Sequence, residues 1–219
     1  MFEAIYLEEL KDLKYRVKSI IETIKERAPA TGALYIGVPG GRSVVHIISA
    51  LKMLEDDLLK QVHLVLVDER LSGEKNIDTI KMGGLDELIA ENRFSETQII
   101  PTQEANMPLD LVFLGVGEDG HIASLFPGSY SYLSDVTTPV ITTIDDSPKP
   151  PPQRVTITYS GFSRLSSQAN YILLFLGETK RDALKRYISG ESVESLPSAF
   201  FRDTMDNVTI ISDSKESLS

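Results

Sequence analysis

Residues 110–121 read DLVFLGVGEDGH, an unbroken apolar run that passes directly into a glycine-rich polar turn. A short apolar run without polar alternation is typical of a strand buried on both faces, as in a parallel sheet covered by helices. Two further runs have the same form, ALYIGV at residues 33–38 and VHLVLV at residues 62–67. Each run is followed by a polar cluster, so the sequence predicts parallel strands that end in polar loops.

Amphipathic segments alternate with these strands. Apolar side chains at spacings of three and four predict helices over residues 7–27, 43–54 and 178–188, and a shorter helix around residues 85–91. Further strands are predicted at residues 155–159, 171–176 and 208–212, and the tail over 212–219 is expected to fray. The alternation predicts one Rossmann-like α/β domain over residues 1–219, with a mostly parallel sheet flanked by helices on both faces.

The composition excludes several classes of function. The 219 residues carry 22 Lys and Arg against 32 Asp and Glu, a net charge of −10, which argues against a nucleic-acid partner because phosphate backbones are bound by clustered cations. A small anionic ligand is compatible, since a few local cations can hold one phosphate. The chain has no cysteine, which removes disulfides, thiol nucleophiles and thiolate zinc sites. With no signal-like leader or long apolar run, we expect a cytoplasmic protein without a membrane partner.

The first polar cluster, Gly40-Gly41-Arg42-Ser43, lies between a predicted strand and a predicted helix. Glycines allow the backbone to approach an anion, and the amides of the helix N-terminus together with the Ser43 hydroxyl could bind a phosphate. The pattern fits equally well a tight turn in which Ser43 only caps the helix. The loop lacks the Gly-Lys-Ser/Thr ending of a nucleotide P-loop, which favours a small phosphate over a triphosphate.

His121 is the histidine best placed for catalysis. It follows a strand within a glycine-rich turn, whereas His46 lies inside a predicted helix and His63 inside a predicted strand, positions typical of structural residues. An imidazole, with an ordinary pKa of about 6.5, can accept and return a proton near neutral pH. A histidine that caps a turn is the competing interpretation. Residues 115–120 also spell GxGxxG, but Pro127 interrupts the long helix that a dinucleotide site requires.

Other charged residues follow or precede predicted strands. Asp68-Glu69-Arg70 ends the strand at 62–67, and a carboxylate pair beside an arginine could hold a hydroxyl and an anion together. Lys149 and Arg154 lie in and after a proline-rich segment that is more typical of a stiff loop than of a domain boundary. All of them are also compatible with a solvated surface. Because ligands bind beyond the carboxyl ends of parallel strands, we expect the clusters at 40–43, 68–70 and 117–121 to converge.

Residues 117–128, GEDGHIASLFPG, resemble the signature of the 6-phosphogluconolactonases, the sugar-lactone hydrolases of the pentose phosphate pathway. The segments at 40–43, 68–70, 147–156 and 177–184 agree with this family in order and spacing, so the resemblance covers most of the chain. The related glucosamine-6-phosphate deaminases continue from the histidine into Phe-Asn-Glu-Pro and typically have tyrosine at the position of Arg70. Here residues 124–127 read SLFP, without a carboxylate, which favours the lactonases.

The resemblance implies hydrolysis of 6-phospho-D-glucono-1,5-lactone to 6-phospho-D-gluconate without a metal or other cofactor. It implies that His121 activates water as a base and then protonates the ring oxygen, that Arg70 places the substrate, and that Asp68 orients Arg70 or a sugar hydroxyl. The implied sugar-phosphate contacts are Gly40, Gly41, Arg42, Ser43, Lys149 and Arg154. The family usually has Gly-Gly-Ser-Thr-Pro in the first loop, so Arg42 either adds a phosphate contact or points to solvent.

Two other functions stay open at this stage. A deaminase or isomerase of the same fold would release ammonia from glucosamine 6-phosphate or interconvert aldose and ketose phosphates. A non-catalytic sensor would bind a sugar phosphate without turnover. The sensor is less favoured, because the chain has no basic patch for a nucleic acid and because His121 and Asp68 would then have no evident task.

Overall fold

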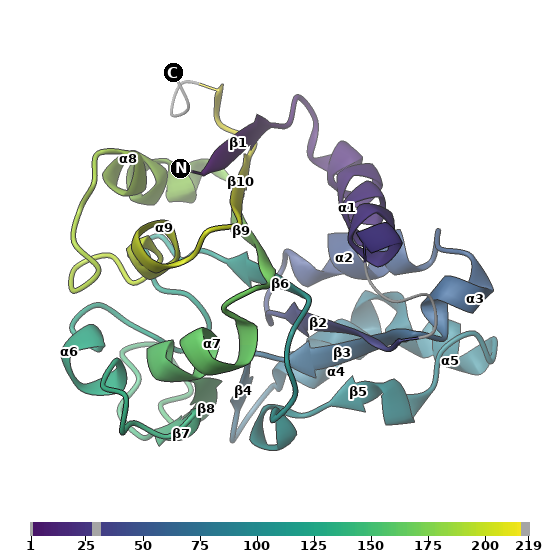
Figure 1. The fold of residues 1–219 in the computed structure, drawn as a ribbon, viewed down its shortest axis with the longest axis horizontal. Helices are drawn as coiled ribbons and strands as arrows, with labels where there is room; N and C mark the ends of the chain where they lie inside the picture. Colours follow the sequence, from purple (N-terminus) through teal and green to yellow (C-terminus); the bar gives the residue numbers. More distant parts are fainter. Residues whose placement is uncertain (1, 28–31, 216–219) are drawn as a thin grey trace.

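The computed structural model describes residues 2–27 and 32–215, and its main element is a seven-stranded sheet in which all paired neighbours are parallel (Figure 1). The strand order is β1-β10-β9-β6-β2-β3-β5. The strands are β1 (Glu3–Tyr6), β2 (Leu34–Val38), β3 (Val62–Leu66), β5 (Ile99–Ile100), β6 (Leu111–Gly115), β9 (Asn170–Phe175) and β10 (Val208–Ser212). The three apolar runs form β2, β3 and β6, and the predicted parallel sheet is confirmed.

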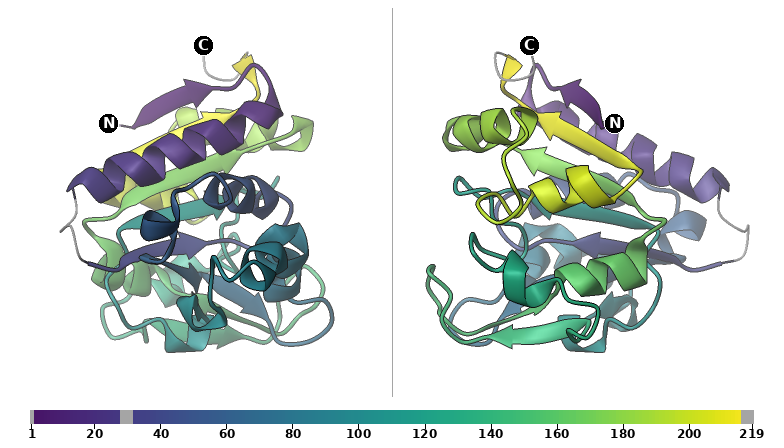
Figure 2. Two further views of the ribbon diagram at one scale, coloured as in Figure 1. Left: turned by 90° about the vertical axis from the view of Figure 1, so that its right-hand side faces the viewer. Right: turned by 60° about the vertical axis from the view of Figure 1, so that its left-hand side comes forward.

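Helices cover both faces of the sheet (Figures 1 and 2). The side chains of the central strands alternate between two cores. On β3, Leu64 packs into the first core and Val65 into the second, which explains why the run shows no polar alternation. The first core includes residues of α1 (Leu13–Arg27), α2 (Val44–Leu51), α3 (Asp56–Leu59), α4 (Asn76–Ile80) and α5 (Asp86–Ala90). The second includes residues of α7 (Tyr159–Ser166), α8 (Arg181–Ile188) and α9 (Ala199–Thr204).

A smaller sheet of three antiparallel strands, in the order β4-β8-β7, was not predicted. Its strands are β4 (Asp68–Arg70), β7 (Ile141–Ile144) and β8 (Arg154–Ile157), and α6 (Tyr130–Leu133) precedes β7. Residues 68–70 therefore form a strand instead of a loop. The strand predicted at 155–159 ends at Ile157, because Tyr159 already begins α7. The proline-rich segment is the connection between β7 and β8.

The predicted helices differ from the observed ones at their ends. The helix predicted from residue 7 starts at Leu13, because the Leu7 amide instead donates to the Ser212 carbonyl over 2.8 Å and continues the sheet edge. The helix around 85–91 is α5, which follows α4 and a π-helical turn over Lys81–Leu85. The helix predicted at 178–188 is a 3-10 turn over Glu178–Lys180 followed by α8. Of the tail, residues 216–219 lie outside the described residues.

Candidate active site

A cavity of about 470 Å³ opens beyond the carboxyl ends of β2, β6 and β9, three neighbouring strands at the centre of the sheet. From β2 the chain proceeds to β3 on one side, whereas β6 pairs with β9 on the other, so the strand order reverses here. Parallel α/β sheets bind ligands at such a reversal. The lining residues are Leu10, Gly40, Gly41, Arg42, Ser43, His46, Gly115, Val116, Gly117, His121, Leu174, Leu176, Gly177, Glu178, Thr179 and Lys180.

The glycine loop at 40–43 forms one wall of this cavity, between β2 and α2. Ser43 immediately precedes α2, but its side chain makes no capping hydrogen bond, so its hydroxyl is available to a ligand. Arg42 is exposed and lines the same cavity. Of the two interpretations of this loop, the arrangement favours an anion-binding turn over a helix cap.

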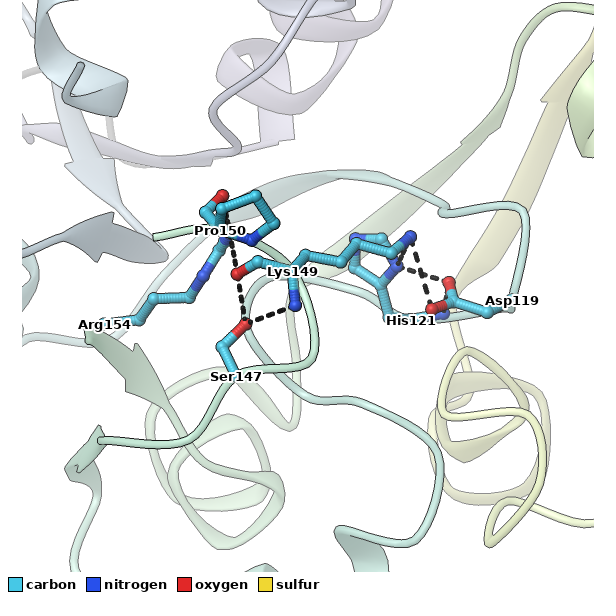
Figure 3. Close-up of polar contacts among 6 residues, drawn as sticks. All are labelled: Asp119, His121, Ser147, Lys149, Pro150 and Arg154. Carbon is cyan, nitrogen blue, oxygen red and sulfur yellow. Dashed lines mark hydrogen bonds and ion pairs between the residues drawn. The ribbon is translucent and has the colours of Figure 1, made fainter. Parts of the chain in front are cut away.

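The turn after β6 holds His121 against Asp119 (Figure 3). Nδ1 of His121 lies 2.5 Å from Oδ1 of Asp119, and Nζ of Lys149 lies 3.3 Å both from Oδ2 of Asp119 and from Nδ1 of His121. An ammonium can only donate, so Nδ1 cannot donate to Asp119 and also accept from Lys149. The shorter contact to the carboxylate favours a proton on Nδ1, which leaves Nε2 as the acceptor.

Charge keeps the Asp119 carboxyl ionised. Burial alone would raise the pKa of Asp119, but the hydrogen bonds and charge of His121 and the charge of Lys149 outweigh it and hold this pKa well below its usual range. The ring of His121 also packs against Phe126, with 4.9 Å between ring centroids. An ionised carboxylate on one side and an aromatic ring on the other fix the orientation of the imidazole at the cavity wall.

Asp68 lies away from the cavity surface, with 4% of its surface exposed. Its Oδ2 accepts a 2.7 Å hydrogen bond from the Ser124 hydroxyl, and Nδ2 of Asn76 donates to its Oδ1 and to its carbonyl. Burial raises the pKa of Asp68, although the Ser124 hydroxyl and the charge of Arg154 lower it. Through these contacts Asp68 connects the segment after His121 to Asn76, which packs against Gly40.

Glu69 stabilises the backbone between β4 and the start of α4. Its carboxylate accepts hydrogen bonds from the backbone amides of Arg70 and Asn76, each over 2.6 Å, and from the amide of Ile77 over 3.0 Å. It thus binds amides at the start of α4, which otherwise lack partners.

Arg154 organises the loop that carries Lys149. Its guanidinium donates to the carbonyls of Lys149, Pro150 and Pro151 over 3.1–3.3 Å. Figure 3 shows Arg154 beside the first two of these residues. Arg70 lies opposite Arg154 in the β4–β8 register and donates to the Glu74 carbonyl over 3.1 Å. Neither arginine is among the residues that line the cavity.

The predicted convergence is therefore partly observed. Gly40, Gly41, Arg42, Ser43 and His121 line one cavity, and Lys149 reaches it through its contact with His121. Asp68, Arg70 and Arg154 lie outside the lining. Asp68 contacts Ser124 and Asn76, and Arg154 holds the loop of Lys149.

Among the lining residues that were not predicted as site residues are two with basic side chains, Lys180 and His46. Lys180 lies after β9, and burial lowers its pKa, with Glu118, Lys149, Asp119 and Arg42 among the charges that act on it. Its position beyond a strand's carboxyl end could have pointed to it. His46, interpreted as structural, also lines the cavity. His63 fits its structural interpretation, because its ring packs against Tyr35 and its Nδ1 lies 3.1 Å from the Gln61 carbonyl.

Within residues 2–27 and 32–215, no group of three or more His, Asp or Glu side chains has the arrangement of a metal site. No helix in this part of the chain has the length and apolar character needed to cross a membrane.

Comparison with known proteins identifies similar sequences. The family model described as "Glucosamine-6-phosphate isomerases/6-phosphogluconolactonase" matches residues 90–210. A rice protein (Oryza sativa subsp. indica) described as "Probable 6-phosphogluconolactonase 3, chloroplastic" is 31% identical over 218 residues, which covers 83% of this chain and 63% of the rice protein. The human 6-phosphogluconolactonase is 42% identical over 90 residues, covering 41% of this chain and 33% of the human protein. The matches thus span less than two thirds of these relatives.

Solved structures share the fold over nearly the whole chain. The 6-phosphogluconolactonase from Trypanosoma brucei superposes with a TM-score of 0.79 at 19% identity, covering 100% of this chain and 99% of that one. A monomeric glucosamine-6-phosphate deaminase superposes with a TM-score of 0.69 at 17% identity, covering 99% of each chain. At such identities the likeness establishes the fold, which lactonases and deaminases have in common.

Proposed function

Since the chain belongs to the family of the glucosamine-6-phosphate isomerases and 6-phosphogluconolactonases, we propose that it hydrolyses 6-phospho-D-glucono-1,5-lactone to 6-phospho-D-gluconate. The observation that supports this most directly is the Asp119–His121 pair at the wall of the central cavity. A lactone is an activated ester, so its hydrolysis requires a base, a bound substrate and no redox cofactor. The proposal includes a cytoplasmic location, as expected from the sequence.

In the proposed mechanism Nε2 of His121 removes a proton from water, and the resulting hydroxide attacks the lactone carbonyl carbon. The tetrahedral intermediate collapses as the bond between this carbon and the ring oxygen breaks. The proton on Nε2 then passes to the departing ring oxygen, which becomes the 5-hydroxyl group. Asp119 stabilises the imidazolium that exists between the two transfers, because its carboxylate stays ionised beside Nδ1.

The phosphate of the substrate would lie at the glycine loop. Backbone amides of Gly40 and Gly41, the Ser43 hydroxyl, and the cations Arg42 and Lys180 all border the cavity there. Holding the distant phosphate places the carbonyl against the water at His121, so binding energy is used for orientation. In this proposal Lys149 contributes positive charge beside His121.

Asp68, Arg70 and Arg154 take supporting roles in the proposal. Arg154 positions the loop of Lys149 through three backbone carbonyls, and Asp68 positions the residues after His121 through Ser124. Arg70 provides a cation opposite Arg154. The sequence argument against a deaminase also applies, because residues 124–127 contain no carboxylate to assist ring opening.

The test is the rate of 6-phosphogluconate formation from freshly generated lactone, measured above spontaneous hydrolysis. Loss of general base catalysis in His121→Ala should lower kcat by about 100-fold or more, with a much smaller effect on KM. His63→Ala, which alters a histidine that does not line the cavity, is the matched control. If wild type does not exceed the background, the lactonase proposal is wrong. Ammonia release from glucosamine 6-phosphate would then identify a deaminase, and binding without turnover a sensor.

A further inference from the structure

His46 is a polar side chain on the cavity wall that the proposed mechanism does not use. It lies in the first turn of α2, three residues after Ser43, so the two residues fall on the same face of the chain where it enters the helix. The side chain is half-buried, and no residue in the described ranges hydrogen-bonds its ring. A half-buried imidazole with free ring nitrogens has hydrogen-bonding capacity to offer a ligand.

Burial in the cavity wall disfavours the charged form of this imidazole. Burial lowers the pKa of His46, and the apolar residues Leu10, Leu174 and Leu176 line the same cavity. The charged and titratable groups that share the lining are Arg42, His121, Glu178 and Lys180. A neutral imidazole carries one N–H donor and one acceptor, and it gains a proton if an anion is placed beside it.

We infer that His46 binds the substrate directly, by donating a ring N–H to a phosphate oxygen of the sugar phosphate. This inference rests on the proposed function. It adds to the phosphate site a residue that belongs neither to the glycine loop at 40–43 nor to the turn at 117–121. The location favours the phosphate over the lactone ring, because His46 shares α2 and its entry with Ser43 and Arg42, whereas the ring must lie at His121. A bound phosphate would also favour the protonated form of His46, so binding would take up a proton.

Nuclear magnetic resonance tests this on the wild-type protein, because the chain has only three histidines. The ring signals are assigned with His46→Gln and His63→Gln and then followed across pH with and without 6-phosphogluconate, the stable product. We expect the His46 signal to move on binding and its titration midpoint to rise. The His63 signal should stay unchanged. A His46 signal that does not change in saturating 6-phosphogluconate overturns the inference.

Steady-state kinetics provide a second test of the role of His46. His46→Leu should raise KM for the lactone by about tenfold or more, as expected for a lost hydrogen bond to a charged group, and should raise KM more than it lowers kcat. His46→Gln keeps an N–H donor and should recover part of this loss, and His63→Gln should match wild type. Wild-type turnover with an unchanged KM in His46→Leu overturns this inference alone. Absence of both turnover and 6-phosphogluconate binding in wild type overturns the proposed function and the inference with it.

Discussion

Gly117 shows how a single missing side chain permits the arrangement of the candidate site. A Cβ at this position would lie 1.9 Å from Nδ1 of His121 and 2.6 Å from Oδ1 of Asp119. The Gly117 amide also donates to the His121 carbonyl over 2.8 Å, so the backbone cannot easily move away. The glycine is therefore required for the close approach of the imidazole to the strand end.

We predict that Gly117→Ala lowers kcat for lactone hydrolysis by about 100-fold, because the methyl group displaces His121 from Asp119 and general base catalysis is lost. Steady-state kinetics with the lactone measure this. Gly83→Ala is the matched control, since its Cβ would meet no atom closer than 3.7 Å, and it should keep wild-type kcat. Equal activity of Gly117→Ala and wild type would mean that the Asp119–His121 contact is dispensable.

The sequence predicts His121 but not His46 as a site residue, and the difference has a physical reason. His121 follows a strand in a glycine-rich turn, a position that the sequence marks directly. His46 lies among apolar residues of a helix, and only the folded structure shows that this residue lines a cavity. Lys180 was missed for a related reason, because its neighbours in space come from other segments of the chain.

The conformation of the loop between β7 and β8 depends on Arg154. Three consecutive carbonyls, those of Lys149, Pro150 and Pro151, accept hydrogen bonds from one guanidinium. Ser147 also stabilises this loop, because its hydroxyl donates to the Lys149 carbonyl and accepts from the Lys149 amide. The position of Lys149 beside His121 thus follows from a network around a residue that does not line the cavity.

Arg154→Ala should mainly raise KM for the lactone, by about tenfold, because the loop loses hydrogen bonds to a charged group and Lys149 loses its placement. Arg154→Lys should behave similarly, since an ammonium cannot reproduce the planar fork of a guanidinium. Arg164→Ala, on the exposed side of α7, controls for loss of one cation and should leave KM unchanged. An unaltered KM in Arg154→Ala would remove Arg154 from the proposed site.

Elements of the parallel sheet were predictable because burial on both faces leaves a continuous apolar run, as in β2, β3 and β6. The edge strand β1 is mostly exposed and shows no such run, so it escaped prediction. In the small sheet, β8 overlaps the strand predicted at 155–159, whereas β4 and β7 were not predicted. β4 consists of Asp68-Glu69-Arg70, whose polar side chains are accommodated by hydrogen bonds that only the tertiary structure reveals.

The whole molecule combines a net charge of −10 with a cavity bordered by cations. Arg42 and Lys180 line the cavity together with the carboxylate Glu178, and Lys149 lies at His121 beside Asp119. Cations are therefore gathered at the site although the chain as a whole is acidic. The sheet explains this contrast. Its central strands β2, β6 and β9 bring together loops that are far apart in sequence, and the net charge contains no information about that convergence.

The contacts of Asp119 with His121 and Lys149 should make the free energy of unfolding depend on pH. The pKa of Asp119 is depressed in the folded protein, whereas an unfolded aspartate has a pKa of about 3.9. The carboxylate therefore contributes stability at pH values above the unfolded pKa, and this contribution is lost as the pH falls through the lower folded pKa.

Urea unfolding at a series of pH values measures this contribution. Near pH 6 the free energy of unfolding should be larger for wild type than for Asp119→Asn, and the difference between the two proteins should become smaller below about pH 4. Glu118→Gln is the control, because it removes the neighbouring charge, which makes no contact with His121. Its difference from wild type in free energy of unfolding should change much less with pH. A difference that stays constant from pH 6 to acid would mean that Asp119 is not held in its ionised form by His121 and Lys149.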